Sequence, residues 1–171
     1  MGYYNPVFIY GIEKFVEDAE ASGVDGLIIV DLPIEENKMQ DLLNQKAIDF
    51  IYMVAPTTDD TRLSKIANVA NGFIYYVSVS GITGTKNAVA SDVSAALTRI
   101  RRHTVVPVAV GFGIKTPKQA AEIARYADAA VVGSALVSCI EKNIDRDGNP
   151  TQSCAADVLE MVRRLSKSVR N

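Results

Sequence analysis

Five short apolar runs recur along this chain at nearly regular intervals, and they restrict the fold more than any other feature. The runs begin at residues 27, 50, 73, 105 and 129, so successive starts lie 23, 23, 32 and 24 residues apart. Each run is continuous rather than alternating, which is typical of parallel strands covered by helices. The stretches between them have helical periodicity. The pattern therefore predicts an α/β fold made of repeated strand–helix units.

Helix start signals lie between the runs. Thr116-Pro117-Lys118-Gln119 has the form of a capping box with proline in the first helical turn. Thr57-Thr58-Asp59-Asp60 and Ser91-Asp92 place side-chain oxygens where the first turn of a helix has free N–H groups. We also expect helices from Ala135 to Ile144 and from about Ser153 to Ser168, the second of which closes the chain.

The composition is that of a globular domain, with 48% hydrophobic and 22% charged residues. A net charge of −2 with mixed signs excludes the basic surface of a nucleic-acid-binding protein. Cys139 and Cys154 have no CxxC spacing and no histidine nearby, so neither a metal site nor a disulfide is expected. No apolar run approaches the roughly 20 residues that span a bilayer, and no signal peptide opens the sequence. We expect a cytoplasmic protein with no membrane partner.

Two of the apolar runs end in glycine. Gly111-Phe112-Gly113 follows one run, and Gly133-Ser134-Ala135 follows the next and leads directly into a predicted helix. Glycine lets the backbone turn sharply and approach a ligand, while free N–H groups at a helix start favour an anion. A tight turn alone would account for one such motif. Two of them on adjacent strands indicate a phosphate site.

The position of these motifs distinguishes between two folds built from strand–helix units, the Rossmann fold and the TIM barrel. No strand end carries the GxGxxG of a Rossmann fold. Phosphate sites of (β/α)8 TIM barrels use the loops after strands seven and eight. If the two glycine motifs follow strands seven and eight, counting back along the runs makes Gly2-Tyr3-Tyr4 the tail of strand three. We expect one domain over residues 1–171, an incomplete TIM barrel of about six units that runs from the end of strand three through the closing helix. A complete barrel has about 250 residues, so roughly 80 would precede Met1.

Two further segments suit an active site of this kind. Gly81-Ile82-Thr83-Gly84-Thr85 is followed by small and polar residues, which is typical of a mobile lid with glycine hinges; an ordinary long loop is the alternative. Tyr75 is expected inside the barrel or at its mouth, where core packing is its default role.

An acid–base pair, in contrast, cannot be assembled from these residues. Asp31 is the one carboxylate that directly ends a strand, and it could equally brace a loop. His103 is the only histidine, and it falls after a predicted helix, away from the catalytic end of the barrel. The segment 145–150 lacks the ligand spacing of a calcium loop and is predicted to be a surface turn.

At this point the chain resembles the tryptophan synthase alpha chain family along nearly its whole length. The segments that carry the resemblance are Gly2-Tyr3-Tyr4-Asn5-Pro6, Gly23-Val24-Asp25-Gly26, Asp31-Leu32-Pro33 with Glu35-Glu36, Ala55-Pro56-Thr57, Tyr75-Tyr76-Val77-Ser78, Gly81-Ile82-Thr83-Gly84, Pro107 to Ile114 and Gly133-Ser134-Ala135. Each is weak alone, but the order and spacing of the set are specific. The resemblance is to the C-terminal two thirds of that family, with strands one and two absent.

The resemblance implies a lyase of tryptophan biosynthesis that cleaves indole-3-glycerol phosphate to indole and glyceraldehyde 3-phosphate by a retro-aldol reaction. It implies phosphate-binding roles for Gly84, Phe112, Gly113, Gly133 and Ser134, pocket roles for Tyr3, Ile28, Met53 and Tyr75, and a lid role for Thr83. Asn5 and Pro33 match loops that face the beta chain, the partner in an alpha-beta-beta-alpha complex. Pyridoxal phosphate belongs to that partner, so no cofactor is expected here.

The resemblance also implies that the catalytic groups are missing. The family's glutamate on strand two and the aspartate on the following loop match no position of this sequence, so we expect the chain alone to be inactive. Three alternatives stay open. The chain could be a non-catalytic remnant that binds phosphate or the beta chain, an unstable product of a shortened gene, or another phosphate-binding barrel such as phosphoribosylanthranilate isomerase or indole-3-glycerol phosphate synthase. The block from Tyr75 to Gly84 argues against the last.

Overall fold

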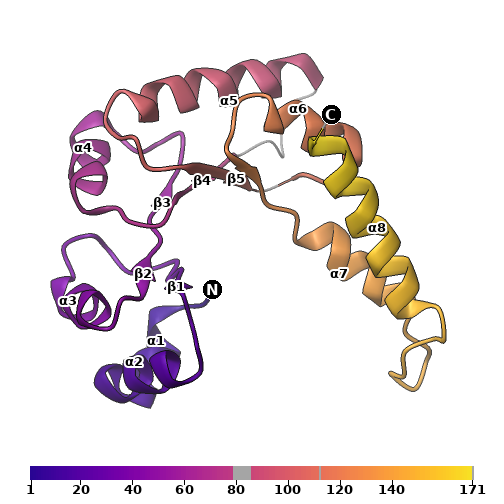
Figure 1. Cartoon of the computed structure of the whole chain (residues 1–171), viewed down its shortest axis with the longest axis horizontal. Helices are drawn as coiled ribbons and strands as arrows, with labels where there is room; N and C mark the ends of the chain where they lie inside the picture. The colour runs from indigo at the N-terminus through magenta and orange to yellow at the C-terminus, as the bar shows by residue number, and fades with distance from the viewer. Residues whose placement is uncertain (79–85, 112, 171) are drawn as a thin grey trace. The chain divides into compact units, whose positions relative to one another are not determined.

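The structure is a computed structural model of the chain, and it describes residues 1–78, 86–111 and 113–170. Helices and strands alternate along most of the described residues (Figure 1). The elements are α1 (Tyr4–Tyr10), α2 (Ile12–Ala21), β1 (Gly26–Leu27), α3 (Asn37–Gln45), β2 (Asp49–Phe50), β3 (Met53–Val54), α4 (Asp60–Val69), β4 (Ile74–Val77), α5 (Lys86–Arg101), β5 (Val108–Gly111), α6 (Pro117–Ala124), β6 (Ala129–Ala130), α7 (Ser134–Glu141) and α8 (Cys154–Val169).

The contacts group these elements into two compact units. The first unit comprises residues 1–75 and 100–107, and the second comprises residues 76–99 and 108–171. Strand β4 contributes to both. The expectation of one domain therefore stays a prediction, and each unit is described by itself.

The opening residues extend the sheet of the first unit. Gly2 forms a parallel bridge with Ile29, in which the Gly2 N–H donates to the Ile28 carbonyl at 2.9 Å and the Val30 N–H donates to the Gly2 carbonyl at 3.0 Å. Strand β1 in turn pairs in parallel with β2, with Leu27 opposite Phe50. Gly2 thus makes one isolated bridge outside the named strands, and the tail of strand three stays a prediction.

The apolar run at 50–54 is divided between two neighbours. The Ile51 N–H donates to the Leu27 carbonyl, whereas the Tyr52 carbonyl accepts from the Tyr75 N–H, each at 2.9 Å. The first half of the run thus pairs toward β1 and the second half toward β4. Among the described residues the strands form one sheet of β1 and β2 and another of β3 to β6, rather than a closed ring.

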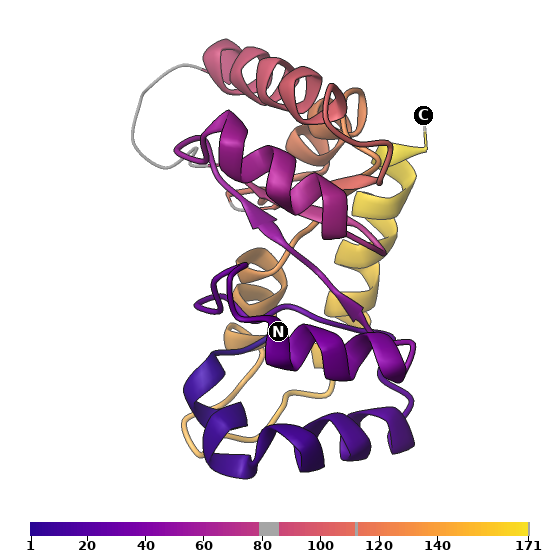
Figure 2. The same ribbon diagram turned by 90° about the vertical axis from the view of Figure 1, so that its left-hand side faces the viewer.

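The first unit begins with a helical corner that the sequence did not suggest. Helices α1 and α2 meet at Gly11, whose φ of +93° is readily adopted only by glycine (Figure 2). Val7 of α1 and Ile12 and Val16 of α2 are buried. Asn5, expected in a loop, instead lies in the first turn of α1.

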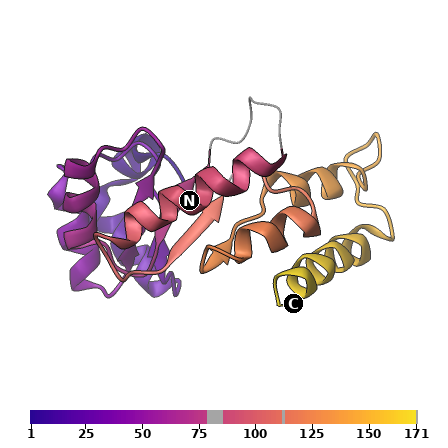
Figure 3. The same ribbon diagram turned by 90° about the horizontal axis from the view of Figure 1, so that it is seen from above.

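In the second unit, β5 lies between β4 and β6. The Ser78 N–H donates to the Gly111 carbonyl, and β5 pairs in parallel with β6 through Ala109 opposite Ala129. Helix α8 packs against α6 and α7 (Figure 3). The predicted capping box at Thr116 is confirmed, since its hydroxyl accepts from the Gln119 N–H while the Gln119 side chain accepts from the Thr116 N–H.

The boundaries of the helices differ from the sequence expectation mainly at α5. The cap-type residues Ser91 and Asp92 lie inside this helix, with exposed side chains, because the helix begins at Lys86. Its buried stripe of Val93, Leu97 and Ile100 continues the helical periodicity past them. Helix α7 ends at Glu141 rather than at Ile144, whereas α8 lies within one residue of its predicted bounds.

Candidate functional site

The two glycine turns of the second unit follow the same edge of its sheet. Strands β5 and β6 are parallel with Val110 opposite Ala130. Gly113 and Gly133 each lie three residues beyond this pair, at the carboxyl ends of their strands. The Val131 N–H still donates to the Val110 carbonyl at 2.8 Å, so the pairing continues one residue past β6. The sheet therefore brings both predicted phosphate turns to one edge.

The backbone at each turn leaves room for a ligand. Gly113 is exposed and has a φ of +77°, a conformation that other residues rarely adopt. Gly133 is also exposed, and a Cβ atom built on it would meet no atom within 4 Å. Neither turn is closed by packing at these positions, which is the geometry that a backbone approach to phosphate requires.

Ser134 begins α7, and Gly133 is the N-cap residue. No side chain caps this end, and the first turn of α7 carries no acidic residue. The Gly133 carbonyl accepts from the N–H groups of Leu136 and Val137, so the helix is bonded from its first turn onward. An uncapped helix start with an exposed hydroxyl suits an anion electrostatically.

Three predicted site residues lie outside the described residues. These are Gly84 and Phe112 of the phosphate set and Thr83 of the lid. The structure therefore does not test their roles, nor the lid expected over 81–85.

Two of the four predicted pocket residues lie in strands of the first unit, and the other two lie next to its isolated bridge. Tyr3 follows the bridge of Gly2 and is exposed, while Ile28 is half-buried and its carbonyl accepts from the Gly2 N–H. Met53 is half-buried in β3, and Tyr75 is buried in the neighbouring β4. The backbone bonds thus join Gly2, the residue before Tyr3, to Ile28, and they join Tyr75 to Tyr52, the residue before Met53.

Burial also changes the acidity of the tyrosines on these strands. Desolvation raises the pKa of Tyr52 to about 12, and it also raises the pKa of Tyr75 above its ordinary value. Both phenols therefore stay neutral at physiological pH and act as packing or hydrogen-bonding groups rather than as bases.

The carboxylates Asp31 and Asp59, which follow apolar runs, have structural partners. Asp31 Oδ1 accepts from the Tyr4 N–H at 2.7 Å, and Asp59 Oδ1 caps α4 by accepting from the Arg62 N–H at 2.7 Å. His103 follows α5, as expected, with Nε2 at 3.9 Å from Asp60 Oδ1. The residues that the structure describes bring together no candidate acid–base pair at the glycine edge.

The two residues predicted to face a partner chain are both exposed. Asn5 lies in α1, and Pro33 lies in the turn that follows β1, where its carbonyl accepts from the Glu36 N–H at 3.1 Å. Helix α1 also exposes Phe8 and Ile9. Exposure is compatible with the predicted contact but does not test it.

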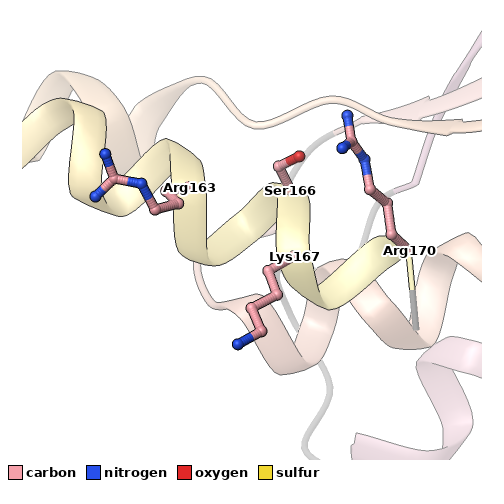
Figure 4. A pocket seen from close by; sticks show the side chains of 4 residues that line it. All are labelled: Arg163, Ser166, Lys167 and Arg170. Atoms are coloured by element: carbon pink, nitrogen blue, oxygen red, sulfur yellow. The ribbon is translucent and has the colours of Figure 1, made fainter.

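A separate hollow on α8 is lined by positively charged side chains, but these side chains do not form a binding site. The hollow is lined by Arg163, Ser166, Lys167 and Arg170. Figure 4 shows Ser166 and Arg170 pointing to one side of α8 and Lys167 pointing to the other, so the cations do not converge. Arg163 is already paired with Glu160 of the same helix. Cations near a helix C-terminus also have a structural explanation in the helix dipole.

The part of the chain that the structure describes shows neither a cluster of metal-type ligands nor a membrane-spanning helix. It contains no group of three or more His, Cys, Asp or Glu side chains that could hold a metal ion. The turn at 145–150 is held by Asp145, whose Oδ1 accepts from the N–H groups of Asp147 and Asn149 at 2.9 Å each. Cys139 and Cys154 are free thiols, and no described helix is long and apolar enough to span a membrane.

One polar residue near the glycine edge was not singled out by the sequence. Ser78 directly follows β4 and is buried, and its hydroxyl donates to the Gly111 carbonyl at 2.9 Å. The only signal in the sequence is a small polar residue that ends an apolar run, which by itself indicates no more than a strand end.

Comparison with known proteins identifies a protein family that matches this chain. The sequence profile described as "Tryptophan synthase alpha chain" matches residues 1–169. A curated tryptophan synthase alpha chain from Acidiphilium cryptum (strain JF-5) is 50% identical over 171 residues, which cover 99% of this chain and 62% of that protein. The chain thus spans less than two thirds of the length of this relative.

Solved structures give the same relationship at the level of the fold. Tryptophan synthase subunit alpha from Campylobacter jejuni has a TM-score of 0.80 and 34% identity, over 93% of this chain and 62% of that one. A chain from a study of the tryptophan synthase a2b2 complex of Pyrococcus furiosus has a TM-score of 0.81 and 32% identity, over 96% and 64% respectively. The likeness confirms the predicted TIM-barrel family and its strand–helix repeat.

Proposed function

Because this chain belongs to the tryptophan synthase alpha chain family, we propose that it takes part in the lyase reaction of tryptophan biosynthesis. In that reaction indole-3-glycerol phosphate undergoes retro-aldol cleavage to indole and glyceraldehyde 3-phosphate. The observation that carries the proposal is the shared edge of β5 and β6, where Gly113 and the Gly133-Ser134 helix start follow paired parallel strands.

The proposed role of this edge is to hold the substrate phosphate. The N–H groups at the start of α7 and the Ser134 hydroxyl would donate to phosphate oxygens, and the helix dipole would favour their charge. Gly113 and Gly133 would let the backbone approach closely, because neither carries a side chain. Hydrogen bonds to a charged group typically contribute about 1.5–3 kcal/mol each. These hydrogen bonds would bind and orient the substrate but would not carry out the chemical step.

The chemical step needs groups that the described residues do not bring together. Cleavage breaks the bond between the indole ring and the glycerol chain, so a base must remove a hydroxyl proton and an acid must protonate the ring carbon. Well-placed acid–base groups typically contribute about 10²–10⁴-fold in rate. With Asp31 and Asp59 engaged as caps, we propose that the 171 residues by themselves do not turn over substrate.

A beta chain is the proposed protein partner. A related chain of Pyrococcus furiosus comes from a study of an a2b2 complex, and Asn5 and Pro33 are exposed, as a contact with a partner requires. In an alpha-beta-beta-alpha assembly the pyridoxal phosphate would belong to the beta chain and not to this chain. Free thiols at Cys139 and Cys154 are consistent with a reducing cytoplasm, where we propose that the protein acts.

Two assays on the purified 171-residue chain test the proposal. Indole release from indole-3-glycerol phosphate is measured with and without the beta chain, and binding of glycerol 3-phosphate is measured by calorimetry. We expect binding without turnover. Turnover at the rate of one of the longer relatives would show that the chain has a working acid–base pair. Absence of binding in a folded sample would contradict the phosphate site.

The same assays address a second candidate, a non-catalytic protein that binds phosphate or the beta chain. The lack of a described acid–base pair favours this candidate. It predicts that the beta chain restores no indole release, whereas a partner that completes the active site would restore it. Another phosphate-binding barrel enzyme would instead turn over a different phosphorylated substrate.

A further inference from the structure

Apart from buried tyrosines, Ser78 is the one polar residue in the buried core of the described part of the chain, with 6% of its surface exposed. It directly follows β4, three residues after the pocket residue Tyr75. A buried hydroxyl is unfavourable unless it is hydrogen-bonded. An apolar residue could occupy a strand end at lower cost, so the presence of serine here calls for a role of the hydroxyl.

The hydroxyl doubles a bond that the backbone already makes. The Gly111 carbonyl accepts from the Ser78 N–H at 3.1 Å, as in an ordinary parallel ladder, and also from the Ser78 hydroxyl at 2.9 Å. The ladder bond would by itself satisfy the carbonyl. Two donors from the same residue restrict the direction of that carbonyl more tightly than one.

Gly111 is the residue at which such a restriction matters. It ends β5, and its lack of a Cβ atom leaves its backbone freer than that of any other residue type. The chain must then reach Gly113 at a φ of +77°. The Gly111 carbonyl belongs to the peptide group through which the chain leaves the strand, and a peptide group is planar, so a restrained carbonyl also restrains the exit of the chain.

We propose that Ser78 is a positioning residue for the phosphate turn, because its hydroxyl fixes the Gly111 carbonyl and thereby sets the course of the backbone into Gly113. The inference rests on the proposed phosphate site and adds to it the residue that directly follows β4. Ser78 itself touches no substrate. It acts through β5, and it links the strand that carries Tyr75 to the turn that would bind phosphate.

The test compares four variants of the full chain, with glycerol 3-phosphate as the probe in calorimetry and the melting temperature as the stability readout. Ser78→Ala removes the hydroxyl, and Ser78→Thr keeps it. Ser168→Ala removes a comparable hydroxyl, which donates to the Leu165 carbonyl at 2.7 Å in α8. Ile123→Val trims a buried side chain of α6, with a loss of stability comparable to that of one hydrogen bond.

We expect Ser78→Ala to raise the Kd for glycerol 3-phosphate about threefold to tenfold, as the loss of one hydrogen bond would. Ser78→Thr, Ser168→Ala and Ile123→Val should keep the original Kd, although Ile123→Val melts earlier. If Ser78→Ala melts earlier but binds like Ile123→Val, Ser78 is merely structural and the inference is wrong, while the proposed function stands. If the unaltered folded chain binds no glycerol 3-phosphate, the proposed function fails and the inference fails with it.

Discussion

Asp31 Oδ1 accepts a hydrogen bond from the backbone N–H of Tyr4 at 2.7 Å, across 27 residues of sequence. Tyr4 is the first residue of α1, and its N-cap residue Tyr3 makes no side-chain cap of its own. The carboxylate therefore supplies from a distant turn the cap that α1 lacks locally. The one carboxylate that the sequence places directly at a strand end thus has a structural role.

Replacing this cap should cost stability and leave ligand binding unchanged. We expect Asp31→Ala to destabilise the fold by about 1 kcal/mol, which lowers the melting temperature by roughly 2–4 °C in a chain of this size. Asp31→Asn keeps an acceptor oxygen and should lose less. The melting temperature and the Kd for glycerol 3-phosphate are measured together. A large loss of binding without a loss of stability would assign Asp31 to the ligand site instead.

A side chain at Gly72 should be unfavourable. Its φ is +60°, and a Cβ atom there would lie 2.6 Å from Asp49 Oδ2 and 2.9 Å from Ile51 Cδ1. We expect Gly72→Ala to cost about 2 kcal/mol or more, since backbone strain and steric contact add. Gly148→Ala is the matched control, because Gly148 has a φ of +85° with open space around it. Urea unfolding measures the free energy of unfolding of both variants. Equal losses would show that the steric contact with Asp49 contributes nothing to the effect.

Gly133 offers the opposite test, in which binding changes and stability does not. Its φ is −113°, and no atom lies within 4 Å of a Cβ built there. Gly133→Ala should therefore keep the melting temperature, while the added methyl group prevents close approach of phosphate and weakens glycerol 3-phosphate binding about tenfold or more. Gly2→Ala, also in open space, is the control that should keep the Kd. Unchanged binding in Gly133→Ala would remove Gly133 from the site.

The buried tyrosines predict the alkaline limit of the fold. The pKa of Tyr52 is raised to about 12 by desolvation, so the folded state holds this proton more tightly than the unfolded state, where the pKa is near 10. Stability should be fully present below pH 10 and be lost as the pH rises from about 10 to about 12. Tyr52→Phe should flatten this loss in melting curves taken across that window. Tyr126→Phe, on a more exposed side chain, should leave the curve unchanged.

The parts of the fold that follow from local chemistry could be predicted from the sequence. The capping box at Thr116 and Gln119 needs only its own four residues, and the continuous apolar runs identify parallel strands whatever their neighbours are. Ser91 shows the limit of such signals, because a cap-type residue on the exposed face of a helix is compatible with the helix interior. The helix continues past Ser91 because the buried stripe of α5 packs against the core.

The parts that depend on distant residues could not be predicted. Nothing local in the run at 50–54 shows that Ile51 pairs with β1 while Tyr52 pairs with β4. The cap from Asp31 to Tyr4 and the bond from Ser78 to Gly111 join residues 27 and 33 positions apart. For the candidate site, the sequence identified the glycine turns and the family, but not the hydroxyl that holds one of the turns.

The central claim is that phosphate binds at the shared edge of β5 and β6. The most direct measurement is a titration of the ¹⁵N-labelled chain with glycerol 3-phosphate, followed by the backbone amide resonances. We predict saturable shifts at Gly113, Gly133 and Ser134, with little change in α8. Shifts confined to the neighbourhood of Arg163, Lys167 and Arg170, or no saturable shift at the glycine turns, would contradict the account.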